Sequence, residues 1–420
     1  MRREPMDMDH LPVTNLTTAS ACRRWLMLIV ISIGSFLPMT TWFSATAIAP
    51  QLTELWEISP AQGAWLTGAV QIGFAIGALA SSMAGLPDVF SLRKVIGVSA
   101  FVAAAANLCL LFAPSVGLLM VARFVTGLAL AGVYPPAVKL MSTWFSRGRG
   151  TALGVLLAAL TLGSAFPHLV SARAAELAWQ DVIVTTSFAA FVGGLLIFWL
   201  GGEGPHPFAR SAFDPRHIKT LVRNRALMLA NLGYLGHMWE LYAMWGWILA
   251  YIRAGSPGLG IVGPGAASLL AFFIVASGGI GSIAGGIVAD RIGRTAAAAA
   301  MMAMSGLCAL TIGLTFAGPL WLFTVVAILW GATVIGDSAQ FSAMATELSD
   351  QRYVGTALSL QLSVGIALTF CSIHLVSFIA ETVGWRWSFL VLAPGPLLGV
   401  VAMVALRRMP AARLIAHGLM

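Results

Sequence analysis

The chain has 420 residues, of which 59% are hydrophobic and 10% are charged, and its net charge is +8. A soluble domain is about 45 to 50% apolar with glycine included and about 25% charged. This composition therefore leaves too little polar surface for a water-soluble globule and predicts an all-α integral membrane protein. A helix needs about 20 mostly apolar residues to cross the hydrocarbon layer, so twelve crossings occupy about 240 positions. The length fits twelve transmembrane helices with short loops, two tails and one longer connector.

Apolar runs bounded by charges, glycine and proline predict the twelve spans. In chain order they are 25–48, 63–86, 95–113, 117–144, 151–170, 179–200, 226–251, 267–289, 296–317, 319–345, 355–379 and 387–406.

The basic residues indicate the orientation of the spans. With both tails in the cytoplasm, 19 of the 24 Lys and Arg residues fall in cytoplasmic segments and only Arg173, Arg253 and Arg386 fall outside. This asymmetry follows the positive-inside rule and predicts a multi-pass protein of the cell's inner (plasma) membrane with both termini cytoplasmic. The basic residues form no patch interleaved with aromatic side chains, so we expect no nucleic-acid partner.

The two halves of the chain are similar in sequence. The run Arg147-x-x-Gly150-Thr-Ala-Leu recurs as Arg352-x-x-Gly355-Thr-Ala-Leu, 205 residues later. Other short sequence matches between the two halves occur in the same order and at nearly the same offset. An even number of spans per repeat gives both halves the same orientation. We therefore expect two six-helix halves related by a pseudo-two-fold axis along the membrane normal.

This repeat divides the chain into five parts. They are a cytoplasmic tail (1–24), an N-terminal half (25–200), a cytoplasmic connector (201–225), a C-terminal half (226–406) and a second cytoplasmic tail (407–420).

The chain resembles the major facilitator superfamily over essentially all residues after 24. The loop between spans eight and nine, Gly286-Ile-Val-Ala-Asp290-Arg291-Ile-Gly293-Arg294, is similar to that family's G-x-L-A-D-R-x-G-R loop. The corresponding loop of the first half keeps Asp88 and the basic pair of Arg93 and Lys94, but it lacks the arginine after Asp88 and the glycine. Arg123-x-x-x-Gly127 is similar to a further family element in span four. Span five lacks the G-P-x-x-G-G sequence of the drug antiporters.

The resemblance implies a cytoplasmic gate at these loops. Asp88 would face the start of span eleven near Gly355, and Asp290 would face the start of span five near Gly150. A carboxylate near a helix N-terminus is stabilised by about 0.3 to 1 kcal/mol when exposed. The alternative is a simple turn that carries positive-inside charges.

A few ionisable residues lie at membrane depth. A charge at mid-helix costs at least about 2.5 to 3.5 kcal/mol on insertion scales, so such residues are functional candidates. The main candidates are Arg123, His168, His237, Glu240 and Asp337. The family resemblance places spans one, four, seven and ten around a central cavity, and Arg123, Glu240 and Asp337 fall in these spans.

Glu240 is the predicted proton site. It follows His237 by three residues, so both side chains project from one helical face and are placed to exchange a proton. A carboxyl group in an apolar wall binds a proton more readily than one in water, which suits reversible loading. The alternative is a static polar clasp between helices. Asp337 is the third candidate for proton coupling, and its alternative role is an ion pair with Arg123 or Lys139.

Polar and aromatic residues of spans one, four, five and seven predict the substrate cavity. These candidates are Arg123, Tyr134, Thr41, Trp42, Tyr234, Tyr242 and His168. For His168, packing in the interior is the alternative. Prolines 135 and 136 interrupt span four and free backbone carbonyls, which a cavity or a polar neighbour satisfies.

The resulting hypothesis is a proton-coupled secondary transporter, a symporter or permease working by alternating access on a small anionic or zwitterionic solute. Efflux of amphipathic compounds and a non-transporting solute sensor remain alternatives. The sequence contains no HExxH, nucleophile elbow or P-loop, so we expect no enzyme, no cofactor and no metal. We expect a monomer whose partners are the substrate, protons and the lipid bilayer.

Overall fold

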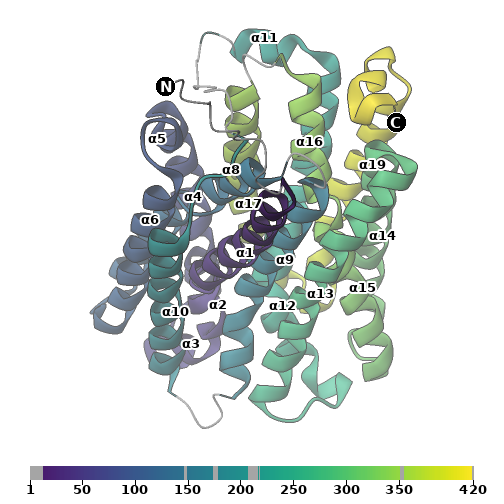
Figure 1. The fold of residues 1–420 in the computed structure, drawn as a ribbon. Helices are drawn as coiled ribbons and strands as arrows, with labels where there is room; N and C mark the ends of the chain where they lie inside the picture. Colours follow the sequence, from purple (N-terminus) through teal and green to yellow (C-terminus); the bar gives the residue numbers. More distant parts are fainter. Residues whose placement is uncertain are drawn as a thin grey trace, which may run out of the picture.

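A computed structural model describes residues 13–145, 149–173, 178–206, 216, 218–350 and 354–418. These residues form helices joined by short loops, and no strand occurs among them. Figure 1 shows the long helices packed side by side in one bundle. At one end of this bundle lie the short helices α5 (Leu86–Val89) and α11 (Ile218–Arg223) together with the C-terminal η5 (Pro410–Gly418). We call this the connector end.

The first half of the bundle runs from α1 to α10. Besides α5 it contains α1 (Val13–Met39), α2 (Ser44–Ala47), α3 (Ala49–Trp56), α4 (Pro60–Met83), α6 (Leu92–Leu108), η1 (Cys109–Phe112), α7 (Val116–Leu130), α8 (Tyr134–Trp144), α9 (Arg149–Ala172) and α10 (Trp179–Leu200).

The second half follows α11. It contains α12 (Arg225–Leu259), α13 (Pro264–Ile292), α14 (Arg294–Thr311), η3 (Ile312–Leu314), α15 (Leu320–Gly336), α16 (Ser338–Leu348), α17 (Val354–Thr382), α18 (Trp385–Ser388), η4 (Phe389–Leu392) and α19 (Pro394–Arg407).

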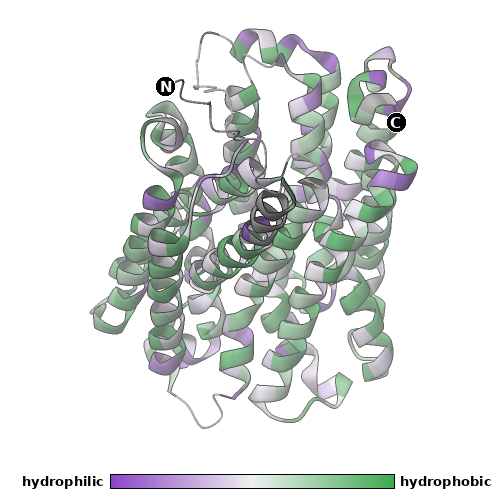
Figure 2. Cartoon of the chain, in the orientation of Figure 1, coloured by the Kyte–Doolittle hydropathy of each residue, from purple (hydrophilic) through white to green (hydrophobic). Residues whose placement is uncertain are grey.

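Ten helical segments of the described chain are long and apolar enough to cross a membrane. They coincide with ten of the twelve predicted spans. The other two predicted spans correspond to α1 and α12, which are long helices at the start of each half. Figure 2 shows hydrophobic residues along the bundle and hydrophilic residues gathered toward its ends, as expected for a protein whose solvent is lipid.

The two halves repeat the same packing. In the first half α4 packs on α7 and α6 packs on α10, and in the second half α13 packs on α15 and α14 packs on α19. Equivalent glycines permit the close contacts, because a Cβ at Gly127 would overlap the Val70 carbonyl and a Cβ at Gly331 would overlap the Ile274 carbonyl. The expected pair of six-helix halves is thus present, and the halves meet along α4 with α17 and α9 with α13.

Several predicted spans are interrupted. The first breaks between α1 and α2 just after Pro38, the fourth between α7 and α8, and the tenth at Asp337 between α15 and α16. The fourth and tenth spans occupy equivalent positions in the two halves. Breaks free backbone groups that need other partners at membrane depth, so they mark the places where side chains of the site are positioned.

Candidate functional site

A cavity lies between the two halves of the bundle. Its empty space, including the part open to solvent, measures about 510 Å³. The lining residues are Met39, Trp42, Tyr134, Leu157, Leu160, Thr161, Ser164, Tyr234, Met238, Leu241, Tyr242, Trp245, Ile335, Ser338, Leu362 and Ile366. They come from α1, α8, α9, α12, α15, α16, α17 and the turn after α1.

The lining is apolar and aromatic with several hydroxyl groups, and none of these lining residues is charged. Trp42 of the first half stacks on Tyr242 of the second half, with ring centroids 5.3 Å apart and an interplanar angle of 19°. Phe74 packs against the same indole at 4.9 Å. Aromatic rings from both halves therefore form one wall of the cavity. Of the predicted cavity residues, Tyr134, Trp42, Tyr234 and Tyr242 line it.

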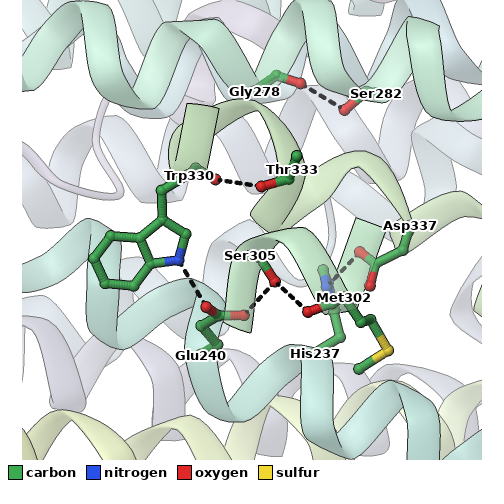
Figure 3. A network of polar contacts seen from close by, with 9 residues as sticks. All are labelled: His237, Glu240, Gly278, Ser282, Met302, Ser305, Trp330, Thr333 and Asp337. Atoms are coloured by element: carbon green, nitrogen blue, oxygen red, sulfur yellow. Dashed lines mark hydrogen bonds and ion pairs between the residues drawn. The ribbon is translucent and has the colours of Figure 1, made fainter. Parts of the chain in front are cut away.

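His237 and Asp337 form a buried pair at the break of the tenth span. The Nδ1 atom of His237 lies 2.8 Å from Oδ1 of Asp337, and the two residues are 2% exposed (Figure 3). The rings of Tyr234 and Phe341 pack beside the imidazole at 6.0 and 5.7 Å. The pair joins α12 to the junction of α15 and α16.

Glu240 is buried inside the second half and points away from the central cavity toward α14 and α15. Ser305 Oγ donates to Oε2 at 2.8 Å, and Trp330 Nε1 donates to Oε1 at 2.7 Å (Figure 3). Within the described part of the chain, no basic nitrogen lies within 4 Å of this carboxyl group. Although His237 and Glu240 are three residues apart on one helix, the structure gives them different partners.

Arg123 is fully buried in α7, and its guanidinium binds the broken region of the first span. Its Nη1 donates to the Thr41 carbonyl at 2.8 Å and to Ser44 Oγ at 3.2 Å, and its Nη2 donates to the Trp42 carbonyl. Its Nε donates to the carbonyl of Leu66 in α4 at 3.0 Å. Arg123 is not among the residues that line the cavity; it satisfies carbonyls that the helix break leaves free.

The remaining predicted cavity residues also lie outside the lining. Thr41 is buried and donates its hydroxyl to the Pro38 carbonyl at 2.8 Å. His168 is 1% exposed, and neither of its ring nitrogens has a hydrogen-bond partner among the described residues. The alternative ion pair of Asp337 with Arg123 or Lys139 is replaced by the pair with His237.

The predicted gate motif lies at the connector end of α13 and the start of α14. Asp290 and Arg291 are exposed, and Gly293 has a φ of 91°, which favours glycine. Arg294 Nη2 binds Glu347 Oε1 of α16 at 2.8 Å. In the first half Arg93 is exposed at the start of α6. In the second half no atom would lie within 4 Å of a Cβ at Gly286. The side chain of Asp88 and residues 146–148 lie outside the described part of the chain, so the cytoplasmic gate at these loops remains a prediction.

Several residues of this site carried no signal in the sequence. Ser305, Trp330 and Ser338 belong to helices far along the chain from Glu240 and Trp42, and serine and tryptophan are common in membrane helices. The polar contacts that they make become visible only when the helices are packed. Trp245 is an aromatic residue of span seven, but its place in the cavity wall depends on its contacts with Phe43 and Tyr242, at 6.1 and 5.8 Å.

The repeated halves, their interrupted helices and the cavity between them are the architecture of an α-helical membrane transporter. The sequence model of the Major Facilitator Superfamily matches residues 31–280, more than half of the chain. The chain belongs to this family.

Curated relatives transport small acids. The gallate transporter of Pseudomonas putida is 24% identical over 354 residues, which cover 76% of this chain and 77% of that protein. The niacin transporter of Acinetobacter baylyi is 34% identical over 131 residues, 29% of each chain. The 4-hydroxybenzoate transporter of Pseudomonas putida is 25% identical over 240 residues, covering 56% of this chain and 53% of that protein.

Two solved structures share the fold. A bacterial homologue of the human lysosomal transporter Spinster, in an inward-facing and occupied conformation, has a TM-score of 0.68 at 14% identity and covers 92% of this chain and 97% of its own. The nucleoside transporter NupG has a TM-score of 0.69 at 14% identity and covers 90% of this chain and 99% of its own.

Proposed function

We propose that this protein is a proton-coupled secondary transporter that moves a small organic acid, with an aromatic carboxylate as the leading class. The observation that carries this proposal is the adjacency of two sites. Ser338 lines the cavity, and its neighbour Asp337 is paired with His237 at 2.8 Å. A change in the protonation of this pair acts on the same helix break that shapes the cavity.

The aromatic wall supports the substrate class. Trp42, Tyr242 and Phe74 present flat rings, and planar ligands pack well against such rings. Uncharged donors, and no carboxylate, line the cavity, which favours an anion over a cation. The relatives named as transporters of gallate, niacin and 4-hydroxybenzoate carry acids with a planar aromatic ring.

Coupling to protons rests on three buried groups of the second half, His237, Asp337 and Glu240. Ionisable groups at this depth are costly and commonly form proton relays in transporters. In this scheme the cavity opens alternately to each side as the halves rock about α4–α17 and α9–α13, with the Asp88 and Asp290 loops as the cytoplasmic gate. The connector end is then the cytoplasmic side.

The test is transport by purified protein in liposomes with labelled 4-hydroxybenzoate, nicotinate and gallate. We expect counterflow of at least one acid, and accumulation when a pH gradient is imposed. Binding without counterflow would identify a sensor instead. Counterflow that is indifferent to the pH gradient would remove proton coupling and keep transport.

Efflux of amphipathic compounds is the second candidate, because Met39 and Met238 add flexible apolar side chains to the lining. The same liposomes loaded with a lipophilic cation distinguish the two functions. Preferential movement of the cation over the three acids would favour efflux.

A further inference from the structure

The buried tryptophans of this protein fall into two classes. Four of the 14 tryptophans are buried, namely Trp42, Trp144, Trp245 and Trp330. Trp144 donates its indole N–H to the Gly202 carbonyl at 2.7 Å, and Trp330 donates to Glu240 at 2.7 Å. Buried indole N–H groups normally have such a partner.

Trp42 and Trp245 are the exceptions. They are 1% and 3% exposed, and neither Nε1 atom has an acceptor among the described residues. Both residues line the central cavity, one from each half of the bundle. Their rings flank the same side chain, because Tyr242 stacks on Trp42 at 5.3 Å and meets Trp245 edge-on at 5.8 Å. Two unused donors thus lie on two rings that contact the same tyrosine in the cavity lining.

The neighbouring hydroxyl groups do not supply the missing acceptors. Neither indole N–H finds a hydroxyl acceptor among the described residues, and Thr161 and Ser164 of the cavity donate to carbonyls of their own helix at 2.9 and 3.1 Å. The cavity lining contains no carboxylate that would accept from an indole. A ligand with two acceptor atoms close together satisfies both donors, and a carboxylate is the simplest group of this kind.

Arg123 adds a positive charge next to the backbone of Trp42. Its guanidinium donates to the backbone carbonyls of Thr41 and Trp42. Within the described residues it has no carboxylate within 4 Å, so its charge is not neutralised locally. A buried cation in a region of low dielectric attracts an anion over a longer range than it would in water.

We propose that the indole N–H groups of Trp42 and Trp245 hold the carboxylate of an aromatic acid while its ring packs against the aromatic wall. This assignment rests on the proposed function and names the groups that recognise the substrate. Because the two donors belong to different halves, the carboxylate bridges them, and binding favours the state in which the halves are closed around the ligand.

The experiment measures binding of labelled 4-hydroxybenzoate to Trp42→Phe and Trp245→Phe, with nicotinate and gallate as further probes. Phenylalanine keeps an aromatic ring and removes the donor. Trp247→Phe is the matched control, since Trp247 lies on the same helix two residues away and its N–H already donates to the Ile373 carbonyl at 2.8 Å. Competition by 4-methylphenol, which lacks the carboxylate, reports ring binding separately.

We expect the dissociation constant of the acid to rise about 10- to 100-fold in each variant, as for loss of a hydrogen bond to a charged group. Competition by 4-methylphenol and the Trp247→Phe control should stay close to wild type. Unchanged affinity of the acid in both variants overturns the assignment, and so does an equal loss of 4-methylphenol binding. Because the two residues lie in different halves, either variant tests the donor alone if the other fails to fold.

Failure of this inference is distinguishable from failure of the proposed function. A wild-type protein that transports another solute but binds none of the three acids overturns the inference and leaves transport intact. A wild-type protein that moves no solute overturns the proposed function.

Discussion

His237 and Asp337 lie 100 positions apart in the chain, and their side chains meet at 2.8 Å where the tenth predicted span breaks. Asp337 both ends α15 and precedes α16, so the imidazole of α12 holds the carboxylate at the pivot between two helices. A buried pair of this kind is strongly destabilised when one partner alone is removed or changes charge. Substitution of one partner therefore tests the proton coupling proposed for this pair.

Asp337→Asn keeps the shape of the side chain and removes its charge. We expect accumulation driven by a pH gradient to be abolished, because the pair no longer releases and binds a proton, while counterflow of the substrate continues. Both are measured in the same liposomes. Asp181→Asn is the control, since Asp181 accepts a hydrogen bond from the Ala178 N–H at the start of α10, far from the pair. Full accumulation by Asp337→Asn would exclude the pair from coupling.

Glu240→Gln tests the second acidic group. We expect it to lose pH-driven accumulation and to retain exchange. The amide accepts only one of the two hydrogen bonds from Ser305 and Trp330, so we also expect a stability loss of about 1 to 3 kcal/mol.

Ser305→Ala separates these two effects. It removes one of the same hydrogen bonds without touching the carboxyl group, so it should keep pH-driven accumulation. Transport by Glu240→Gln that matches Ser305→Ala would assign Glu240 a purely structural role.

Arg123→Met tests the structural role of the buried guanidinium. The substitution leaves the carbonyls of Thr41, Trp42 and Leu66 without donors in the membrane interior. We expect a loss of at least about 3 kcal/mol, equivalent to a fall in Tm of roughly 3 to 4 °C for a chain of this length, measured by thermal unfolding in detergent. Arg173→Met, at an exposed position, should leave Tm unchanged. A stable Arg123→Met variant that has lost substrate binding would instead place Arg123 in the substrate site.

Gly331→Ala tests the close contact of α13 and α15. The new Cβ would overlap the Ile274 carbonyl and crowd Ser277 Oγ, so the helices must separate, at a cost of about 1 to 3 kcal/mol. Gly286→Ala is the matched control, because no atom lies within 4 Å of its Cβ position. Thermal unfolding should show a lower Tm for the first variant and an equal or higher Tm for the second. Equal values for both variants would contradict the packing argument.

The sequence alone was sufficient for the all-helical membrane fold, the family and the repeated halves. Apolar run length follows from bilayer thickness, and a duplicated order of anchors such as Arg147 and Arg352 reports a duplicated fold regardless of how the helices pack. Tyr134, Trp42, Tyr234 and Tyr242 were also placed at the cavity from the sequence, because the family resemblance puts spans one, four and seven around a central cavity and these residues offer hydroxyl and aromatic groups there.

Only the packed structure decided the partners of the buried polar groups. Helical spacing put His237 and Glu240 on one face, yet a hydrogen bond depends on which neighbouring helix faces each side chain, and these neighbours lie 65 to 100 residues further on. For the same reason the sequence did not show that Arg123 donates to the carbonyls freed by the break after Pro38. Nor did it show that two of the four buried tryptophans have no acceptor for their indole N–H among the residues that the structure describes. Periodicity is local, whereas satisfaction of buried polar groups is a property of the whole bundle.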